Sequence, residues 1–131
     1  MSTLFKNIVL VMILISVLLP NVSSIGLESD KNGNYLTDRD GMPIYYFIND
    51  DPYSGVSNCY GACSSIWKPL EEQATAPLPP SLGLENFGSI FRADSKFQTT
   101  YKGRPLYTYS GDSNGLPSGN GRDDLWFLMR P

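Results

Sequence analysis

The chain of 131 residues contains no histidine and only two cysteines. Histidine is the commonest general base, so its absence removes the Ser–His and Cys–His nucleophile schemes and the imidazoles that complete most zinc sites. Clusters of lysine and arginine are also missing, and the formal net charge is −3. The phosphate backbone of DNA or RNA would therefore find no basic surface to bind on this chain. We expect no enzyme activity, no metal or cofactor, and no nucleic-acid partner.

Long apolar runs are scarce, and the one that stands out lies near the N-terminus at 8–19. It is shorter than the roughly 20 residues that a membrane-spanning helix needs. Val22 and Ser24 fit the small-residue positions of a signal peptidase site. We predict a signal peptide over 1–24, with an uncleaved anchor helix as the alternative. No cysteine near this site can carry a lipid, and after cleavage no transmembrane segment is expected, so the mature chain is predicted to be secreted or extracytoplasmic, at the cell surface or in the periplasm.

A repeated phrase is the most informative feature that is present. GMPIYYFIND at 41–50 returns as GRPLYTYSGD at 103–112, and a displacement of 62 positions aligns 25–51 with 87–113 without a gap. A three-residue deletion then brings the two tryptophans into register. We therefore predict a signal peptide (1–24) followed by a single β-rich domain (25–131), which consists of repeat one (25–70), a proline-rich connector (71–86) and repeat two (87–131).

Short β-branched or aromatic runs alternate with Asn, Asp and Gly turns, a pattern typical of strands joined by tight turns. We predict a mainly β fold of two tandem three-stranded antiparallel meanders, sandwich or barrel-like, whose aromatic faces pack together. A short helix is expected near 60–67, with its end fixed by Pro69. One helical turn is expected near 82–86. The predicted strands are 25–29, 34–38, 43–48, 87–92, 97–101 and 105–109, with a closing strand over 126–129.

The repeated phrase also supplies the candidate binding residues. Alternate strand residues share a face, so two aromatic side chains project together in each repeat, and an aspartate follows at the strand end. Two interpretations stay open. In the first, the aromatic side chains belong to the core and the aspartates stabilise the turns after the strands. In the second, phenols and carboxylates line a ligand groove of the kind that binds sugars or organic cations. The candidates are Tyr45, Phe47, Asp50, Tyr107, Tyr109 and Asp112.

Cys59 and Cys63 are the only cysteines. In an exported chain an even count favours a disulfide, and closing the five-residue ring would contribute roughly 2 kcal/mol to stability. The alternative is a reversible thiol pair or a Cu(I) site. Because histidine is absent, Met42 or Met129 would then have to supply a further ligand.

Other functional motifs in the sequence are incomplete. The segment that begins at Asp30 starts like a calcium-binding loop, but it lacks the turn glycine and the terminal glutamate. SIWK at 65–68 spells the S-x-x-K motif without its partner motifs. The glycine-rich segment 111–122 is predicted to be a surface loop. With the strand edge near Asp50 and Asp112, it is the predicted contact surface.

Segments 45–50 and 107–112 resemble the Y-x-[FWY]-x-x-D signature of a family of predicted secreted lipoproteins and secreted repeats of unknown function. CYGACSSIWKPL at 59–70 is similar to the C-x-G-x-C-x-x-x-W-P-P-L segment of that family, with Lys68 in place of a proline. The resemblance covers nearly the whole mature chain. It implies export and a repeated architecture, and it implies no particular activity.

These observations predict an exported, non-catalytic binding or structural module of the cell surface or extracytoplasmic space. Its ligand, an envelope or extracellular component, is not identified by the sequence. The alternative hypothesis is an extracytoplasmic thiol-redox or copper-handling protein that uses Cys59 and Cys63.

Overall fold

Strands account for most of the regular structure in the computed structural model, which describes residues 23–113 and 115–131. The predicted signal peptide lies outside these residues, apart from its last two positions, Ser23 and Ser24. The elements are β1 (Ile25–Asp30), β2 (Gly33–Asp38), β3 (Ile44–Phe47), α2 (Ala62–Ile66), β4 (Trp67–Pro69), η1 (Leu84–Asn86), β5 (Phe87–Phe91), β6 (Phe97–Tyr101), β7 (Arg104–Tyr109), η2 (Arg122–Asp124) and β8 (Trp126–Leu128).

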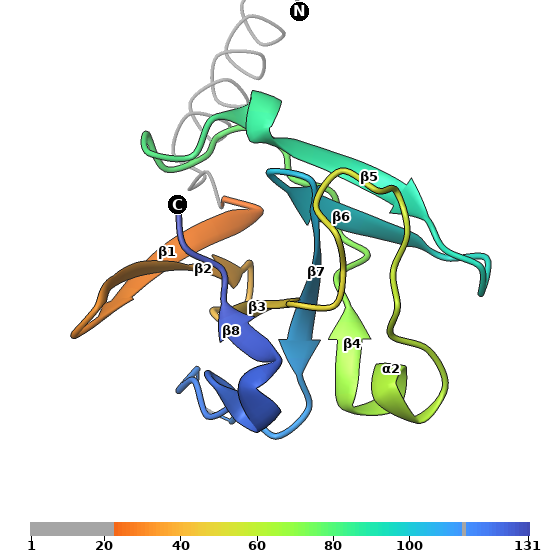
Figure 1. The fold of residues 1–131 in the computed structure, drawn as a ribbon. Helices are drawn as coiled ribbons and strands as arrows, with labels where there is room; N and C mark the ends of the chain where they lie inside the picture. The colour runs from red at the N-terminus through yellow and green to blue at the C-terminus, as the bar shows by residue number, and fades with distance from the viewer. Residues whose placement is uncertain (1–22, 114) are drawn as a thin grey trace, which may run out of the picture.

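The strands form two antiparallel sheets (Figure 1). One is the β1–β2 hairpin, and the other has the strand order β5-β6-β7-β3-β8, with β4 also paired with β7. The mainly β class and the two repeats are therefore confirmed, in an open arrangement with β5 and β8 at the ends of the larger sheet. Repeat two forms the predicted meander. In repeat one, β2 meets β3 only at a bridge between Thr37 and Pro43, because next to this bridge the N–H of Leu36 donates to the carbonyl of Met129 instead of to β3.

Equivalent strands exchange partners between the repeats. At the centre β3 pairs with β7, and Tyr45 lies opposite Tyr107. The last strand of each repeat pairs with the third strand of the other, β8 with β3 and β4 with β7. An approximate two-fold axis therefore passes between the two tyrosines, and the sheet of each repeat is incomplete without the other. The matching cross-strand pairs are Phe47 with Trp126 and Tyr109 with Trp67.

The ungapped alignment of the repeats is one residue out of register in the hairpins. Gly26 lies opposite Thr37, and its counterpart Gly88 lies opposite Thr100 rather than Thr99. Counted between equivalent cross-strand pairs, the β5–β6 connection, closed by Arg92 and Lys96, is one residue longer than the β1–β2 connection, closed by Asp30 and Gly33. The next connection is one residue shorter in repeat two than in repeat one. The two changes cancel, so the alignment is correct again at Pro105 and beyond.

Buried clusters lie on both faces of the central strands of the larger sheet, whereas β5 has no fully buried residue. The aromatic faces of the two repeats come together because β3 and β7 are neighbours, and they form a cluster of Tyr35, Tyr45, Phe47, Cys59, Trp67, Tyr107, Trp126 and Leu128. The opposite face forms a second cluster around Ile44 and Leu106. Leu82 and Leu78 of the connector and Ile25 of β1 cover it. The connector is therefore part of the core as well as a link.

Helical structure is confined to short segments. α2 lies within the predicted 60–67 range, begins after Gly61 at a φ of 60° and ends where Trp67 becomes extended. η1 matches the helical turn expected near 82–86. Across 23–113 and 115–131, the structure contains no helix of sufficient length and hydrophobicity to span a bilayer.

Candidate functional site

The Tyr and Asp residues of the repeated phrase bond across the repeats. The hydroxyl of Tyr45, in repeat one, donates to Asp112 Oδ2 at 2.7 Å, and the hydroxyl of Tyr107, in repeat two, donates to Asp50 Oδ2 at 2.5 Å. The strand register explains this exchange. Tyr45 and Tyr107 lie opposite each other on antiparallel strands, so each side chain points toward the end of the other strand.

Each aspartate also closes the turn that follows its strand. The N–H groups of Asp50 and Asp112 donate to the carbonyl groups three residues before, at 3.0 and 3.1 Å. Their Oδ1 atoms accept the N–H groups of Asn58 and Ser118, both at 2.7 Å. Each aspartate therefore closes its own turn through its backbone N–H and joins the following loop to the tyrosine of the other repeat through its carboxylate. The repeated motif is a reciprocal clasp, and we call these four side chains the Tyr–Asp clasps.

The two clasps differ in burial. Asp50 is 0% exposed, and the hydroxyl of Tyr107 also contacts Ser57 Oγ at 2.7 Å, which in turn accepts a bond from Arg92. Asp112 is half-buried, and its partner Tyr45 accepts the N–H of Gly119 at 3.1 Å. Burial raises the pKa of Asp50 above its usual range, and the bond from Tyr107 opposes this shift. The pKa values of Tyr45 and Tyr107 are raised, mainly by burial and then by the bonded carboxylates.

The remaining aromatic side chains of the motif form a continuous ring stack. Phe47 stacks on Trp126 at 4.3 Å between ring centroids, Trp126 on Trp67 at 4.0 Å, and Trp67 on Tyr109 at 4.2 Å. The stack runs across the approximate two-fold axis, with equivalent residues at corresponding places. Large stacked rings add packing energy beyond the area they bury. This stack accounts for the recurrence of two aromatic residues in each copy of the phrase.

The structure thus brings all six candidate binding residues together, but mostly in the interior. Tyr45, Tyr107 and Asp50 are fully buried and Phe47 nearly so, whereas Tyr109 and Asp112 are half-buried. This geometry matches the first interpretation, in which these residues belong to the core and stabilise the turns. A ligand that approaches the folded domain can meet only the last two of these residues.

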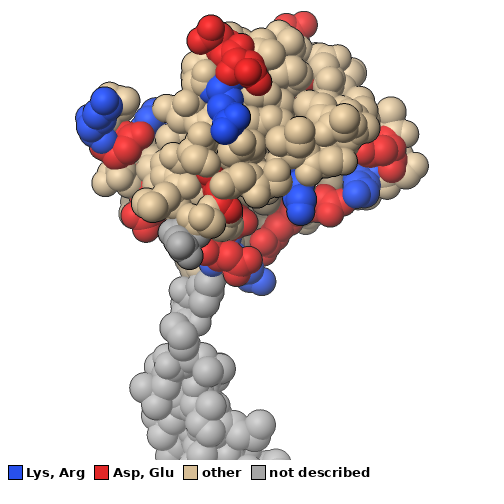
Figure 2. Space-filling model, turned by 90° about the horizontal axis from the view of Figure 1, so that it is seen from below, with Lys and Arg blue, Asp and Glu red and all other residues tan. Residues whose placement is uncertain are grey.

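In the glycine-rich segment 111–122, of which residue 114 lies outside the described residues, Gly119 and Gly121 contact the core. Besides the bond from Gly119 to Tyr45, the N–H of Gly121 donates to the carbonyl of Trp126 at 2.7 Å. A Cβ at Gly119 would lie 2.7 Å from the Trp67 ring, so this close approach requires glycine. Figure 2 views the side of the molecule that carries α2 and this segment, and its surface is mostly uncharged, with charged side chains mainly at the margin. The segment combines a structural role with an exposed outer surface.

Cys59 and Cys63 form the predicted disulfide, with an S–S distance of 2.05 Å and a Cα–Cα distance of 5.3 Å. Arg92, which is almost fully buried, anchors this loop. Its guanidinium donates to the carbonyl of Cys59 at 2.7 Å and to Gln98 Oε1 at 2.7 Å. It also pairs with Asp94 at 3.0 Å, which supplies the opposing charge. A Cu(I) site needs both sulfurs as thiolates, so the copper-handling alternative applies only to the reduced protein.

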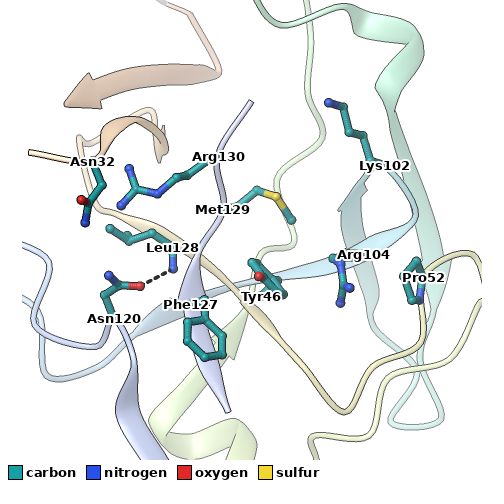
Figure 3. Close-up of a pocket in the computed structure, with 10 residues that line it drawn as sticks. All are labelled: Asn32, Tyr46, Pro52, Lys102, Arg104, Asn120, Phe127, Leu128, Met129 and Arg130. Carbon is teal, nitrogen blue, oxygen red and sulfur yellow. Dashed lines mark hydrogen bonds between the residues drawn. The ribbon is translucent and has the colours of Figure 1, made fainter. Parts of the chain in front are cut away.

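The structure also contains a pocket that the sequence analysis did not predict, on the face opposite the ring stack (Figure 3). Its volume is about 470 Å³. Tyr46 lies between Phe127 and Arg104, and the cationic ends of Lys102 and Arg130 lie on opposite sides. We call it the basic pocket. Its lining residues are Asn32, Tyr46, Pro52, Lys102, Arg104, Asn120, Phe127, Leu128, Met129 and Arg130.

Charges in the basic pocket are of one sign. No Asp or Glu lines it among the described residues. Arg130 is already paired with Asp30 at 2.8 Å, whereas no described carboxylate lies within salt-bridge distance of Arg104 or Lys102. The guanidinium of Arg104 stacks 4.6 Å from the centroid of the Tyr46 ring. Arg104 and Lys102 therefore leave two unpaired cations beside two aromatic rings, an environment suited to an anion with an apolar body.

No metal site is apparent. In residues 23–113 and 115–131, no group of three or more Cys, Asp or Glu side chains is placed to hold a metal ion. The carboxylate of Asp38, one of the aspartates near the predicted turns, accepts the N–H groups of Asp40 and Met42 at 2.9 Å. This is turn chemistry.

A comparison with known protein families finds two repeats in the chain. A family model described as a secreted repeat of unknown function matches residues 26–71 and 88–129, which together make up more than half of the chain. The search of curated proteins and the search of solved structures each gave no match. The two matched stretches coincide with the two halves that the Tyr–Asp clasps join, and the chain belongs to this family of secreted repeats.

Proposed function

We propose that the protein is an exported, non-catalytic binding module whose ligand carries a carboxylate or phosphate group on an apolar body. The observation that supports this most directly is the basic pocket, where Arg104 and Lys102 lie beside Tyr46 and Phe127 without an acidic partner among the described residues. Its volume of about 470 Å³ lies in the range of small-molecule sites. Export is supported by the family and by the disulfide.

Arg104 is the central recognition residue in this proposal. Its ring stacking with Tyr46 fixes the plane of the guanidinium, and Nη1 donates to the carbonyl of Asp50 at a long 3.4 Å. The remaining N–H groups are available to a bidentate oxygen anion, the ligand for which guanidinium geometry is best suited. The ring of Phe127, tilted against Tyr46 at 6.0 Å, supplies an apolar wall.

The non-catalytic character is supported by the chemistry of the titratable groups. The chain has no histidine. The phenols of Tyr45 and Tyr107 hold their protons because burial raises their pKa values, and both are bonded to aspartates. Such groups stabilise the fold and are poor proton-transfer catalysts at neutral pH.

The binding proposal is tested by titrating the secreted, oxidised protein with benzoate and, separately, with inorganic phosphate, followed by NMR chemical shifts. We expect shifts at Tyr46, Arg104 and Phe127, and weaker binding at higher ionic strength. Arg104→Gln should weaken binding at least about tenfold. Arg122→Gln is the matched control, because Arg122 also lies over a tyrosine, Tyr109 at 5.0 Å, outside the pocket.

Equal effects of the two substitutions, or shifts that avoid the pocket, would contradict the binding site. If neither anion binds, the structural role becomes the better account of this exported module. Turnover of any substrate that disappears in Asp50→Asn or Asp112→Asn, in a protein that remains folded, would contradict the non-catalytic assignment.

A further inference from the structure

The strand β5 presents a free backbone edge. Among the described residues it pairs only with β6 and ends the larger sheet (Figure 1). Backbone bonds from Lys102 to Asn86 and from Arg92 to Lys96, both 2.8 Å, belong to this ladder. Hydrogen-bonded positions alternate in antiparallel pairs, so the even-numbered residues face β6. The N–H and C=O groups of Phe87, Ser89 and Phe91 face outward.

The internal repeat provides a direct comparison for this edge. The equivalent strand β1 carries Glu28 and Asp30, and charged residues are a common protection of sheet edges against pairing. β5 reads FGSIF and carries neither a charge nor a proline. At the end of β5, Phe91 is 62% exposed and contacts Phe97 of β6, which is 58% exposed, with 5.0 Å between the ring centroids. One repeat therefore has a protected edge, and the other has an edge open to another strand.

The sequence of β5 is complementary to itself. A two-fold axis through Ser89 places Phe87 of one copy opposite Phe91 of a second copy, and places Gly88 opposite Ile90. Aromatic cross-strand pairs stabilise sheets, and an isoleucine beside a glycine fills the space that the missing side chain leaves.

Hollows on both faces of the strand match this pairing. One, of about 310 Å³, is bordered by Phe87, Leu84 and Ala74, on the side where Phe91 of the second copy would lie. The other, of about 290 Å³, is bordered by Gly88 and Thr100, on the side where Ile90 of the second copy would lie.

We propose that β5 pairs antiparallel with β5 of a second copy of this chain, so that the two larger sheets become one across a two-fold axis. The interface is distinct from the basic pocket, and either proposal can fail without the other. A single added strand buries less than the roughly 800 Å² per partner of a standard interface. We therefore expect a reversible dimer that dissociates on dilution.

The test is sedimentation velocity of the oxidised protein over a wide range of concentration. Wild type should shift from monomer to dimer. Ser89→Lys should remain monomeric, because two lysines would meet at the two-fold axis. Ser29→Lys is the matched control, an exposed serine on the protected strand β1, and it should dimerise like the wild type. Circular dichroism verifies that both variants fold.

Mixing Ser89→Lys with Ser89→Glu provides the decisive result. Only in the proposed register does residue 89 of one copy lie opposite residue 89 of the second copy. The mixture should therefore form a heterodimer in which lysine meets glutamate, while Ser89→Lys alone stays monomeric. A dimer that survives Ser89→Lys, or a mixture that stays monomeric, would overturn the proposal. A wild type that is monomeric at every concentration would also overturn it. The edge of β5 would then be a site for an extended segment of another protein.

Discussion

At the scale of single residues, two aspartates with the same sequence context have different energetic roles. Asp50 is fully buried, and its carboxylate depends on Tyr107 and on the backbone N–H of Asn58. Asp112 is half-buried, and Ser118 donates to it through both its N–H and its hydroxyl at 2.7 Å. Loss of one donor should matter more where water cannot replace it.

Removing the two clasp hydroxyls should therefore have unequal effects. Tyr107→Phe leaves a buried carboxylate short of a donor and should lower the free energy of unfolding by about 1–3 kcal/mol. Tyr45→Phe leaves Asp112 with Ser118 and solvent but also removes the acceptor of the Gly119 N–H, and should cost about 1–2 kcal/mol. Urea denaturation of both variants measures the difference. Equal losses would show that burial does not distinguish the clasps.

The same phenols make the domain sensitive to alkali. Burial and the bonded carboxylates raise the pKa values of Tyr45 and Tyr107 above the ordinary 10.0. Above pH 10 the unfolded chain loses these protons while the folded chain keeps them, so the folded state binds more protons and stability falls as pH rises. The expected slope is up to about 1.4 kcal/mol per pH unit for each tyrosine.

Phenolate absorbance and circular dichroism, recorded together from pH 9 upward, check this. Two tyrosines should ionise only as the fold is lost, and Tyr107→Phe should reduce the pH dependence. Ionisation of all tyrosines in a protein that keeps its native circular dichroism would contradict the prediction.

At the scale of elements, the start of β1 depends on the residue just before it. Ser24 is 3% exposed, and its hydroxyl donates to the carbonyl of Thr75 at 2.9 Å and accepts the N–H of Thr75 at 2.8 Å. This bonds the connector to the first strand. The predicted cleavage after Ser24 would remove these bonds and create an amino terminus at Ile25, which is fully buried.

A chain that begins at Ile25 should therefore be less stable than one that begins at Ser23. Loss of the hydroxyl bonds and burial of a charge should together cost about 1–3 kcal/mol, measured by thermal or urea unfolding. Ser24→Ala in the longer chain is the control that removes the bonds without adding a charge. We expect the intact mass of the exported protein to place its first residue at or before Ser24, and a natural terminus at Ile25 with undiminished stability would contradict this.

Local signals predicted most elements but not their pairing. The alternating aromatic residues and turn residues located β3 and β7 closely. β4 was missed because the CSSIWKPL segment reads as a helix ended by Pro69, although the alignment of Trp67 with Trp126 of the predicted closing strand was a usable signal. The exchange of strands between repeats is a long-range arrangement that no short segment encodes.

The contact surfaces were harder to predict for the same reason. Tyr46, Arg104 and Phe127 come from three separate strands, and only the pairing of β3 with both β7 and β8 brings them together. Arg92 is the last residue of the predicted strand 87–92, and a charged side chain at a strand end suggests exposure. Its burial depends on acceptors from the disulfide loop and β6, and these gather only in the folded chain.

At the scale of the whole molecule, the approximate two-fold axis makes the domain equivalent to a dimer of repeats on one chain. β3 has its main partners, β7 and β8, in the other half, and β4 pairs with β7. The Tyr–Asp clasps and the ring stack also cross between the halves. Each half alone would expose its part of the aromatic cluster to water. It would also leave its aspartate without the tyrosine of the other half, as Asp50 without Tyr107.

The connector should consequently be dispensable as a covalent link but not as a packed segment. Pro80 and Ser81 are exposed, whereas Leu82 is buried in the core. A protease site inserted between Pro80 and Ser81 should, after cleavage, leave both fragments associated with native circular dichroism, because the cross-repeat contacts are unchanged. Each fragment, separated in denaturant and refolded alone, should remain unfolded, and mixing the two should restore the domain. A fragment that folds alone would contradict mutual dependence of the halves, since the exchanged strands would then be additions to a core already complete within one repeat.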